Sequence, residues 1–470
     1  MSNRCQILGI PAGSLAAVAY SLLLLLLAVA PASAQAPDTS GDPVVTPIIR
    51  NVTRVESWSF FEPPEGGGEP DYSMFGNRAT LGVRVKASRI AVQGSLQYAQ
   101  MIGLPRGSIG PGPLGPGPLF FISAQNSRAY QLYFKTLSLR LEDVVPRLSI
   151  EAGRMTYESG AGTPFAGRLI GNAEWTMFER AFDGVRVDYR RPAWRAHASF
   201  VMPTQGAFEE SASPTIGLVQ ITTVSAARGE LEVFAHHYRD TRAIAARPDN
   251  TGARSPRVDI SLRTIGSSLT RTVADLDIAL WGAVQRGDWY GDHHRALSAS
   301  ADAGYGWPRL PAQPSIGGGM RYASGDTNPN DATHGTFFPM VPTTAPSVLA
   351  GTYAQMNARD AYVRAGAMLH QRLSLSASLH RLSLVSRQDR WYSGTGATAF
   401  AGNYFGYSSR PSTLATGLGT AVLVATDLSI APHWRVSASA GLIRGGAVVR
   451  RQFEGRTLTV FVLENTLSLP

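Results

Sequence analysis

Arginine is the residue whose frequency in this sequence points to a chemistry. The chain carries 43 Lys and Arg against 34 Asp and Glu, and its only lysines are Lys86 and Lys135. A guanidinium group is always charged and its forked donors hold carboxylates, so arginines in a partly desolvated channel suit anionic solutes. A GC-rich coding bias is the alternative explanation for the excess. The arginines are scattered along the chain and form no patch interleaved with aromatics, which argues against nucleic acid as a partner.

Histidine and acidic clusters give weaker signals for a metal. Two pairs of adjacent histidines, at 236–237 and 293–294, cannot chelate from a strand, because neighbouring residues there point to opposite faces. Segment 326–331 is rich in oxygen ligands but lacks the glycine and the distal Glu of a calcium loop. We therefore expect no cofactor and interpret the segment as a loop of Asx turns. The minor alternative is a structural Ca²⁺ held by Asp326, Asn328, Asn330 and Asp331.

Length and composition restrict the fold class. The chain has 470 residues, of which 44% are hydrophobic and only 16% are charged, against about 25% charged in soluble globular domains. Beyond the N-terminus no stretch approaches the roughly 20 apolar residues that a transmembrane helix needs. A large soluble β protein or a β-barrel remains.

The N-terminus reads as a secretory signal. An apolar stretch from Leu15 to Ala30 precedes Ala32-Ser33-Ala34, which predicts cleavage after Ala34. An anchor helix is the less favoured alternative. The single cysteine, Cys5, precedes the apolar stretch and leaves with the signal, so the mature chain has no thiol for a disulfide or a metal. We expect a signal peptide at 1–34, a short segment at 35–45 and one domain at 46–470.

Alternation of apolar and polar residues dominates that domain. In segment 78–88 the residues Ala79, Leu81 and Val83 share one face, while Arg78 and Arg84 share the other. The same period of two recurs at 90–99, 185–200, 361–380 and 434–440, and it is typical of strands that lie between two different environments.

The breaks between these strands are of two kinds. Tight turns alternate with long Gly/Pro/Asn/Asp-rich segments at 103–118, 239–256, 323–350 and 387–413. This asymmetry is typical of a transmembrane antiparallel barrel with short periplasmic turns and long extracellular loops. The length accommodates about 16 to 18 strands, enough for an aqueous lumen.

Two segments fit the pattern less well. Arg154 shares its parity with the apolar Ile150 and Ala152, so either the strand bulges at Gly153 or Arg154 lies beyond the lipid band. Segment 457–462 has no clean polar face, which leaves the last strand weakly defined.

Residues 151–191 read EAGRMTYESGAGTPFAGRLIGNAEWTMFERAFDGVRVDYRR. This segment resembles the alginate export family of outer-membrane porins, and weaker matches follow at 322–326, 335–337 and 389–392. The resemblance implies an 18-stranded monomeric barrel that passes an acidic polysaccharide through an arginine-rich constriction. The Gly/Pro-rich segment 103–118 and the chain end Leu469-Pro470, which replaces the usual terminal aromatic, depart from the pattern.

The expected function is an outer-membrane channel without covalent chemistry, and so not an enzyme. The resemblance makes constriction candidates of Arg154, Arg168, Arg180 and Arg186, with Asp183 and Glu179 as acidic counterparts. Strand parity adds Arg84, Arg190, Arg364 and Arg435. The main alternative is a general or small-molecule anion-selective porin for another solute. An outer-membrane barrel hydrolase and a secreted soluble β-rich enzyme are the less favoured ones. Expected partners are outer-membrane lipid, lipopolysaccharide, the anionic solute and the barrel-assembly machinery.

Overall fold

The computed structural model describes residues 43–106, 126–204, 217–249, 257–343, 352–394, 396, 401–402 and 405–469. The expected signal peptide at 1–34 and most of segment 35–45 lie outside the described residues. From Val44 onward the chain forms one compact unit. No helix within the described ranges is long and apolar enough to span a membrane.

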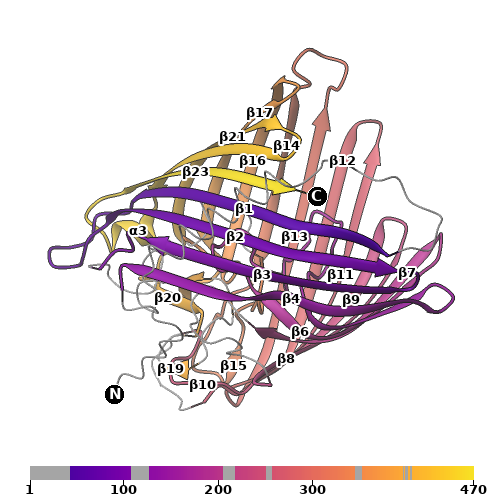
Figure 1. Cartoon of the computed structure of the whole chain (residues 1–470). Coiled ribbons are helices and arrows are strands. Elements are labelled where there is room, and N and C mark those ends of the chain that lie inside the picture. The colour runs from indigo at the N-terminus through magenta and orange to yellow at the C-terminus, as the bar shows by residue number, and fades with distance from the viewer. Residues whose placement is uncertain are drawn as a thin grey trace. The chain divides into compact units, whose positions relative to one another are not determined.

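Eighteen antiparallel strands form a closed barrel (Figure 1), because each pairs with the next and β1 pairs with β23. Its strands are β1 (Val44–Ser59), β2 (Asp71–Ala87), β3 (Ile90–Ile102), β4 (Arg128–Val145), β5 (Leu148–Met155), β6 (Ala181–Arg190), β7 (Trp194–Thr204), β8 (Val219–Arg228), β9 (Leu231–Asp240), β11 (Ile260–Val273), β12 (Leu276–Trp289), β13 (Asp292–Gly306), β14 (Ser315–Ala323), β16 (Ala358–His370), β17 (Leu373–Leu384), β21 (Gly417–Ala431), β22 (Trp434–Gly445) and β23 (Thr457–Leu469). The loops carry β10 (Ala243–Ile244), β15 (Thr333–His334), β18 (Arg390–Gly394), β19 (Ala401–Gly402), β20 (Tyr407–Pro411) and the one-turn helix α3 (Ala447–Arg450).

Turn lengths differ between the two ends of the barrel. Seven connections at one end have two or three residues, and the turn between β11 and β12 places Ala274 (φ 47°) and Asp275 (φ 65°) in the left-handed region that two-residue hairpins favour. At the other end most connections are long. Two exceptions are the eight-residue link 307–314 at the turn end and the two-residue link 290–291 at the loop end.

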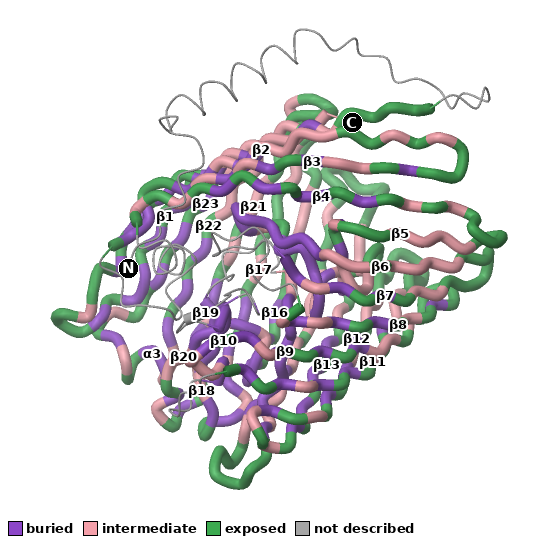
Figure 2. The backbone as a smooth tube through the Cα atoms, turned by 60° about the horizontal axis from the view of Figure 1, so that its bottom comes forward, coloured by how far each residue is buried: buried purple, intermediate pink, exposed green. Residues whose placement is uncertain are grey.

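Burial along the strands confirms the expected alternation (Figure 2). On β2, Arg78 faces the interior and is 2% exposed, whereas Val83 on the opposite face is 42% exposed. The closing strand β23 has no polar face because its inward residues Leu458 and Val460 are buried in an apolar core. Near the loop end, these inward positions of β23 therefore pack against apolar side chains and do not face water.

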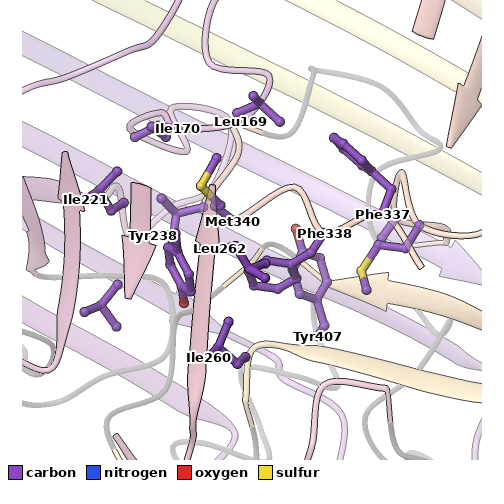
Figure 3. Packing of buried hydrophobic residues seen from close by; sticks show 14 of the residues in the cluster. Leu169, Ile170, Ile221, Tyr238, Ile260, Leu262, Phe337, Phe338, Met340 and Tyr407 are labelled. Carbon is purple, nitrogen blue, oxygen red and sulfur yellow. The ribbon is translucent and has the colours of Figure 1, made fainter. Parts of the chain in front are cut away.

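A second apolar core forms where loop segments fold into the barrel. Segment 156–180, between β5 and β6, meets segment 324–343, which follows β14, through a bridge between Ile170 and Val341. Figure 3 shows Ile170 and Met340 near Tyr238 and Leu262, which belong to the wall strands β9 and β11. These loop segments pack against the inner wall and leave the lumen narrower than the strand count alone implies.

Candidate solute pathway

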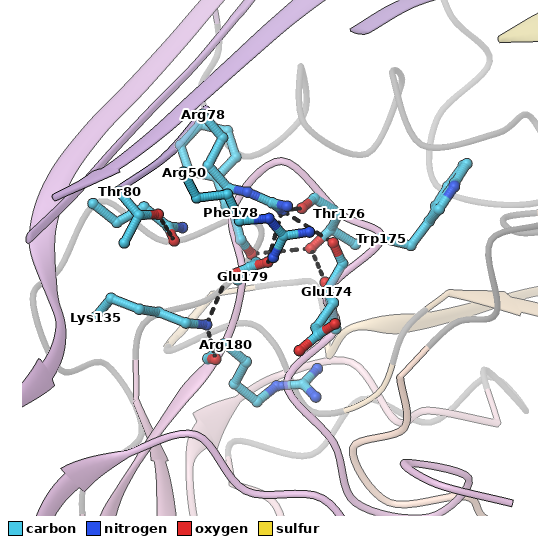
Figure 4. Close-up of polar contacts among 12 residues, drawn as sticks. Arg50, Arg78, Thr80, Lys135, Glu174, Trp175, Thr176, Phe178, Glu179 and Arg180 are labelled. Carbon is cyan, nitrogen blue, oxygen red and sulfur yellow. Dashed lines mark hydrogen bonds and ion pairs between the residues drawn. The ribbon is translucent and has the colours of Figure 1, made fainter. Parts of the chain in front are cut away.

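The inward-folded segment 156–180 is fixed to the wall by Glu179 (Figure 4). Its carboxylate lies 3.0 Å from Arg78, 3.0 Å from Lys135 and 3.8 Å from Arg50. The same cations hold the loop backbone, because Arg78 donates to the carbonyl of Thr176 (2.6 Å) and Lys135 to that of Arg180 (2.7 Å). Burial opposes ionisation, but Lys135 and Arg78 outweigh it and lower the pKa of Glu179 below its usual range.

Arg180 joins the two inward-folded segments. It is 2% exposed, and its Nη1 donates to the carbonyls of Gly171 (2.7 Å) and Val341 (2.8 Å). Burial lowers its pKa to about 10, so the guanidinium stays charged at neutral pH. Glu179 and Arg180, both expected to face the solute, are thus placed where they hold loops together and do not present their charges to water.

Arg154 and Asp183 lie on the opposite face of the sheet from the lumen. β5 pairs with β6 with no register shift, so Gly153, despite a φ of 117°, makes no bulge in that ladder. Arg154 pairs with Leu137, whose side chain is 55% exposed on the outer face. It binds Asp183 through two hydrogen bonds of 2.7 Å. Of the two sequence alternatives the structure adopts the one without a bulge, which corrects the assignment of this pair to the pore.

A cavity of about 530 Å³ occupies the lumen beside segment 156–180. Its lining includes the cations Arg168, Arg321 and Arg364, together with Asp302 and Asp360. The inner face of β14 carries Gly317 and Gly319 beside Arg321. A Cβ at Gly317 would lie 3.1 Å from Nε of Arg364, and one at Gly319 would lie 2.6 Å from Oδ1 of Asp302. Small residues on β14 therefore leave room for long charged side chains from its neighbours.

Arg168 is the cation that the loop contributes to this cavity. It donates to Oγ of Ser300 (2.7 Å) and Oε1 of Gln355 (3.3 Å), and lies over the ring of Trp281 at 4.4 Å. Burial lowers its pKa to about 9. No carboxylate of the described residues lies within ion-pair distance of it. Its hydrogen bonds are made to neutral groups, and Asp302 acts on its charge only from farther away.

The remaining wall cations differ in how far they are neutralised. Arg321 lies 3.9 Å from Asp360 and over the ring of Tyr362 at 4.8 Å. Arg364 is exposed and forms no ion pair with any described residue. Arg321 was missed from the sequence, although it shares the inward parity of Gly317, which could have revealed it.

A second cavity of about 190 Å³ lies on another side of segment 156–180 and also touches Arg168. It is lined by Arg186, Arg190 and Arg195 among others. Arg186 pairs with Glu151 and with Asp188 at 3.3 Å, whereas Arg190 and Arg195 are exposed cross-strand neighbours.

Arg84 and Arg435 lie on the inner face near the turn end. Arg84 is opposite Gln93, and Arg435 is opposite Thr466. Both side chains are exposed and have no ion pair in the described part of the chain. Arg190 and Arg195 also lie near the turn end of their strands, while Arg168, Arg321 and Arg364 lie deeper.

The candidate calcium loop is organised by its own side chains. Asp326 accepts the backbone N–H of Asn328 (3.0 Å), and Asp331 accepts that of Thr333 (2.9 Å). Such contacts form Asx turns. Within the described ranges, no group of three or more His, Cys, Asp or Glu side chains is placed to hold a metal ion.

Comparisons with known proteins agree with this architecture. A family model described as alginate export matches residues 141–462. Pseudomonas aeruginosa OpdK, solved with vanillate, superposes with a TM-score of 0.53 at 11% identity, covering 90% of this chain and 99% of that one. P. aeruginosa OccK9 (OpdG) superposes with a TM-score of 0.55 at 10% identity, covering 90% of this chain and 98% of that one. Acinetobacter baumannii OccAB3 superposes with a TM-score of 0.51 at 9% identity, covering 90% of this chain and 99% of that one. No curated protein sequence matches significantly. At these identities the structural matches show the fold alone.

Proposed function

The chain belongs to the alginate export family, and on this premise we propose that it is an outer-membrane channel for an acidic polysaccharide such as alginate. The observation that carries the proposal is the set of luminal arginines that form no ion pair with a described residue, above all Arg168 and Arg364. A polyuronate has about one carboxylate per sugar, so successive arginines replace part of its hydration and lower the barrier to passage.

Acidic residues among the arginines keep binding reversible. Asp302 and Asp360 share the large cavity with Arg321 and Arg364, and Asp188 shares the small one with Arg186. Conduction requires release as well as capture, so a wall of alternating sign lets a polyanion move from one cation to the next. Aromatic rings beneath Arg168 and Arg321 restrain their guanidinium groups, which reduces the ordering cost of each contact.

A small organic anion is the second candidate solute. OpdK, which shares the fold, was solved with vanillate. The cavity of about 530 Å³ in this chain also has the size of a small-molecule site, for which 300–1,000 Å³ is typical. The two candidates predict different dependence on solute length.

Planar-bilayer recordings test the proposal. We expect anion selectivity in the wild type, and current blockades by oligouronates whose duration grows with chain length. Arg168→Gln combined with Arg364→Gln is expected to shift the reversal potential toward cations and shorten the blockades at least tenfold. Arg154→Gln, on the outer face, is the matched control and should change neither. Selectivity unaffected by the double variant contradicts the arginine pathway, and blockade by monocarboxylates but not by oligomers favours the small-anion alternative.

A further inference from the structure

A row of basic residues crosses four neighbouring strands on the outer face of the barrel. His237 of β9 lies opposite Arg263 of β11, Arg263 opposite Arg286 of β12, and Arg286 opposite Arg295 of β13. All four side chains are exposed. Neighbouring strands are about 4.8 Å apart, so the three guanidinium groups form one continuous cationic strip with the imidazole of His237 at its end.

The charges of this basic row are not compensated by the protein. None of its three arginines forms an ion pair or a hydrogen bond through its side chain with another residue in the described part of the chain. Asp288, one step nearer the loop end on β12, forms no ion pair with them either. Like charges directly opposite each other destabilise a strand pair. The row is therefore a surface that an external anion would stabilise.

The residues beside the row show what kind of anion fits. One step toward the turn end, the same strands carry Ile265, Val284 and Leu297, which are 62%, 53% and 46% exposed. Farther along follow Val233 and Leu280, at 50% and 42%. The row thus marks the boundary between an apolar band and the loop end, where charged groups on the outer face cost little.

The basic row is confined to this sector of the barrel. At the loop end of β4 the outer face carries Tyr130, Leu132 and Phe134 instead. On the neighbouring strands β16 and β17 the outward arginines have no arginine directly opposite them. Arg359 lies between Tyr322 and Ser383, and Arg381 lies opposite Thr420.

We propose that the row formed by His237, Arg263, Arg286 and Arg295 binds the phosphorylated glycolipid anchor of lipopolysaccharide. In outer-membrane barrels the long-loop end is extracellular, so the row reaches the outer leaflet. Forked guanidinium groups hold phosphate oxygens through paired hydrogen bonds. The acyl chains of the same molecule lie along the aliphatic rows beneath. This site is on the outer face and is independent of the solute in the lumen.

The test compares two triple variants of the full chain in nanodiscs. Arg263→Gln, Arg286→Gln and Arg295→Gln together remove the row, whereas Arg359→Gln, Arg381→Gln and Arg444→Gln remove three outward arginines outside it. The probes are lipid A with both phosphates and its dephosphorylated form, with binding measured by native mass spectrometry. Each basic side chain near an anionic membrane surface contributes roughly fivefold. We therefore expect about 100-fold weaker binding of lipid A in the first variant and less than about threefold in the second.

Equal binding of lipid A by the wild type and the first variant overturns the proposal. So does equal binding of phosphorylated and dephosphorylated lipid by the wild type. If the triple variant fails to show the heat-dependent electrophoretic shift of a folded barrel, Arg286→Gln alone replaces it. The single change is expected to weaken binding about fivefold, with partial recovery in Arg286→Lys, and no change on either substitution contradicts the site.

Discussion

Replacing Glu179 by Gln should open the lumen without unfolding the barrel. The wild-type carboxylate is 5% exposed and neutralises two buried cations, Arg78 and Lys135, each at 3.0 Å. Glutamine keeps the shape but removes the charge, and leaves both cations buried without a counter-ion. Their bonds to the carbonyls of Thr176 and Arg180 remain.

Removal of one partner from a buried ion pair costs about 3–5 kcal/mol. Because the eighteen-strand ladder does not depend on Glu179, this cost falls on the packing of segment 156–180 against the wall. Each step of about 1.4 kcal/mol changes an equilibrium constant tenfold. A loss of about 4 kcal/mol therefore lowers the ratio of packed to detached segment 156–180 by roughly a thousandfold.

Single-channel recording measures the consequence. The Glu179→Gln channel should show larger mean conductance and frequent transitions, and added protease should cleave segment 156–180 faster than in the wild type. Glu151→Gln is the matched control, since Glu151 is an inward carboxylate paired with Arg186 on the wall and touches no part of that segment. Conductance and cleavage in Glu179→Gln equal to those in Glu151→Gln would refute the anchoring role.

Three further outcomes are expected. Gly153→Ala should lower the yield of folded barrel measured by electrophoresis, since the φ of Gly153 is 117° and a Cβ there would collide with the carbonyl oxygen of Leu137. Gly229→Ala is its control. Gly229 has a φ of 60° and open space around it, so this variant should retain the wild-type yield to within about twofold. Arg154→Gln should lower the thermal midpoint through loss of its paired bonds with Asp183, at a cost of about 1–3 kcal/mol, while reversal potentials stay unchanged. Burial raises the pKa of Asp389 to about 6, which favours its neutral form in the fold, so its stabilising contribution is full at acidic pH and is lost as pH rises through 6. Scanning calorimetry of Asp389→Asn should show a smaller fall in midpoint between pH 4 and 7 than the wild type, and an equal fall would disprove this titration.

The wall of the barrel could be predicted because its physics is local. A strand between two environments must alternate, and Arg78 and Val83 of β2 show that alternation in the structure as in the sequence. Arg154 follows the same alternation on the outer face of the sheet. Its parity with Ile150 and Ala152 indicated the outer face, and the ladder without a bulge places it there. The resemblance to a family motif pointed to the pore, where the strand geometry does not put it.

The interior contacts had no such local signal. Lys135 and Glu179 are separated by many wall and loop residues, and Arg180 bonds to Val341 across 161 positions. No periodicity links residues so far apart. The apolar content of segment 156–180 was a signal, however, because Phe165, Leu169 and Ile170 are too large and apolar for an exposed loop, and each is at most 5% exposed.

A barrel of eighteen strands has two kinds of inner face, and only one of them is a pore wall. Near the turn end, inward positions meet water and carry exposed cations such as Arg84 and Arg435. Near the loop end, inward positions meet folded loops, so apolar residues such as Leu458 of β23 are as suitable there as polar ones. Because segment 156–180 borders both cavities and supplies Arg168 to each, the loop and not the strand count determines the width of the passage. Substitutions in this loop should therefore alter conductance more than equal charge changes on the wall.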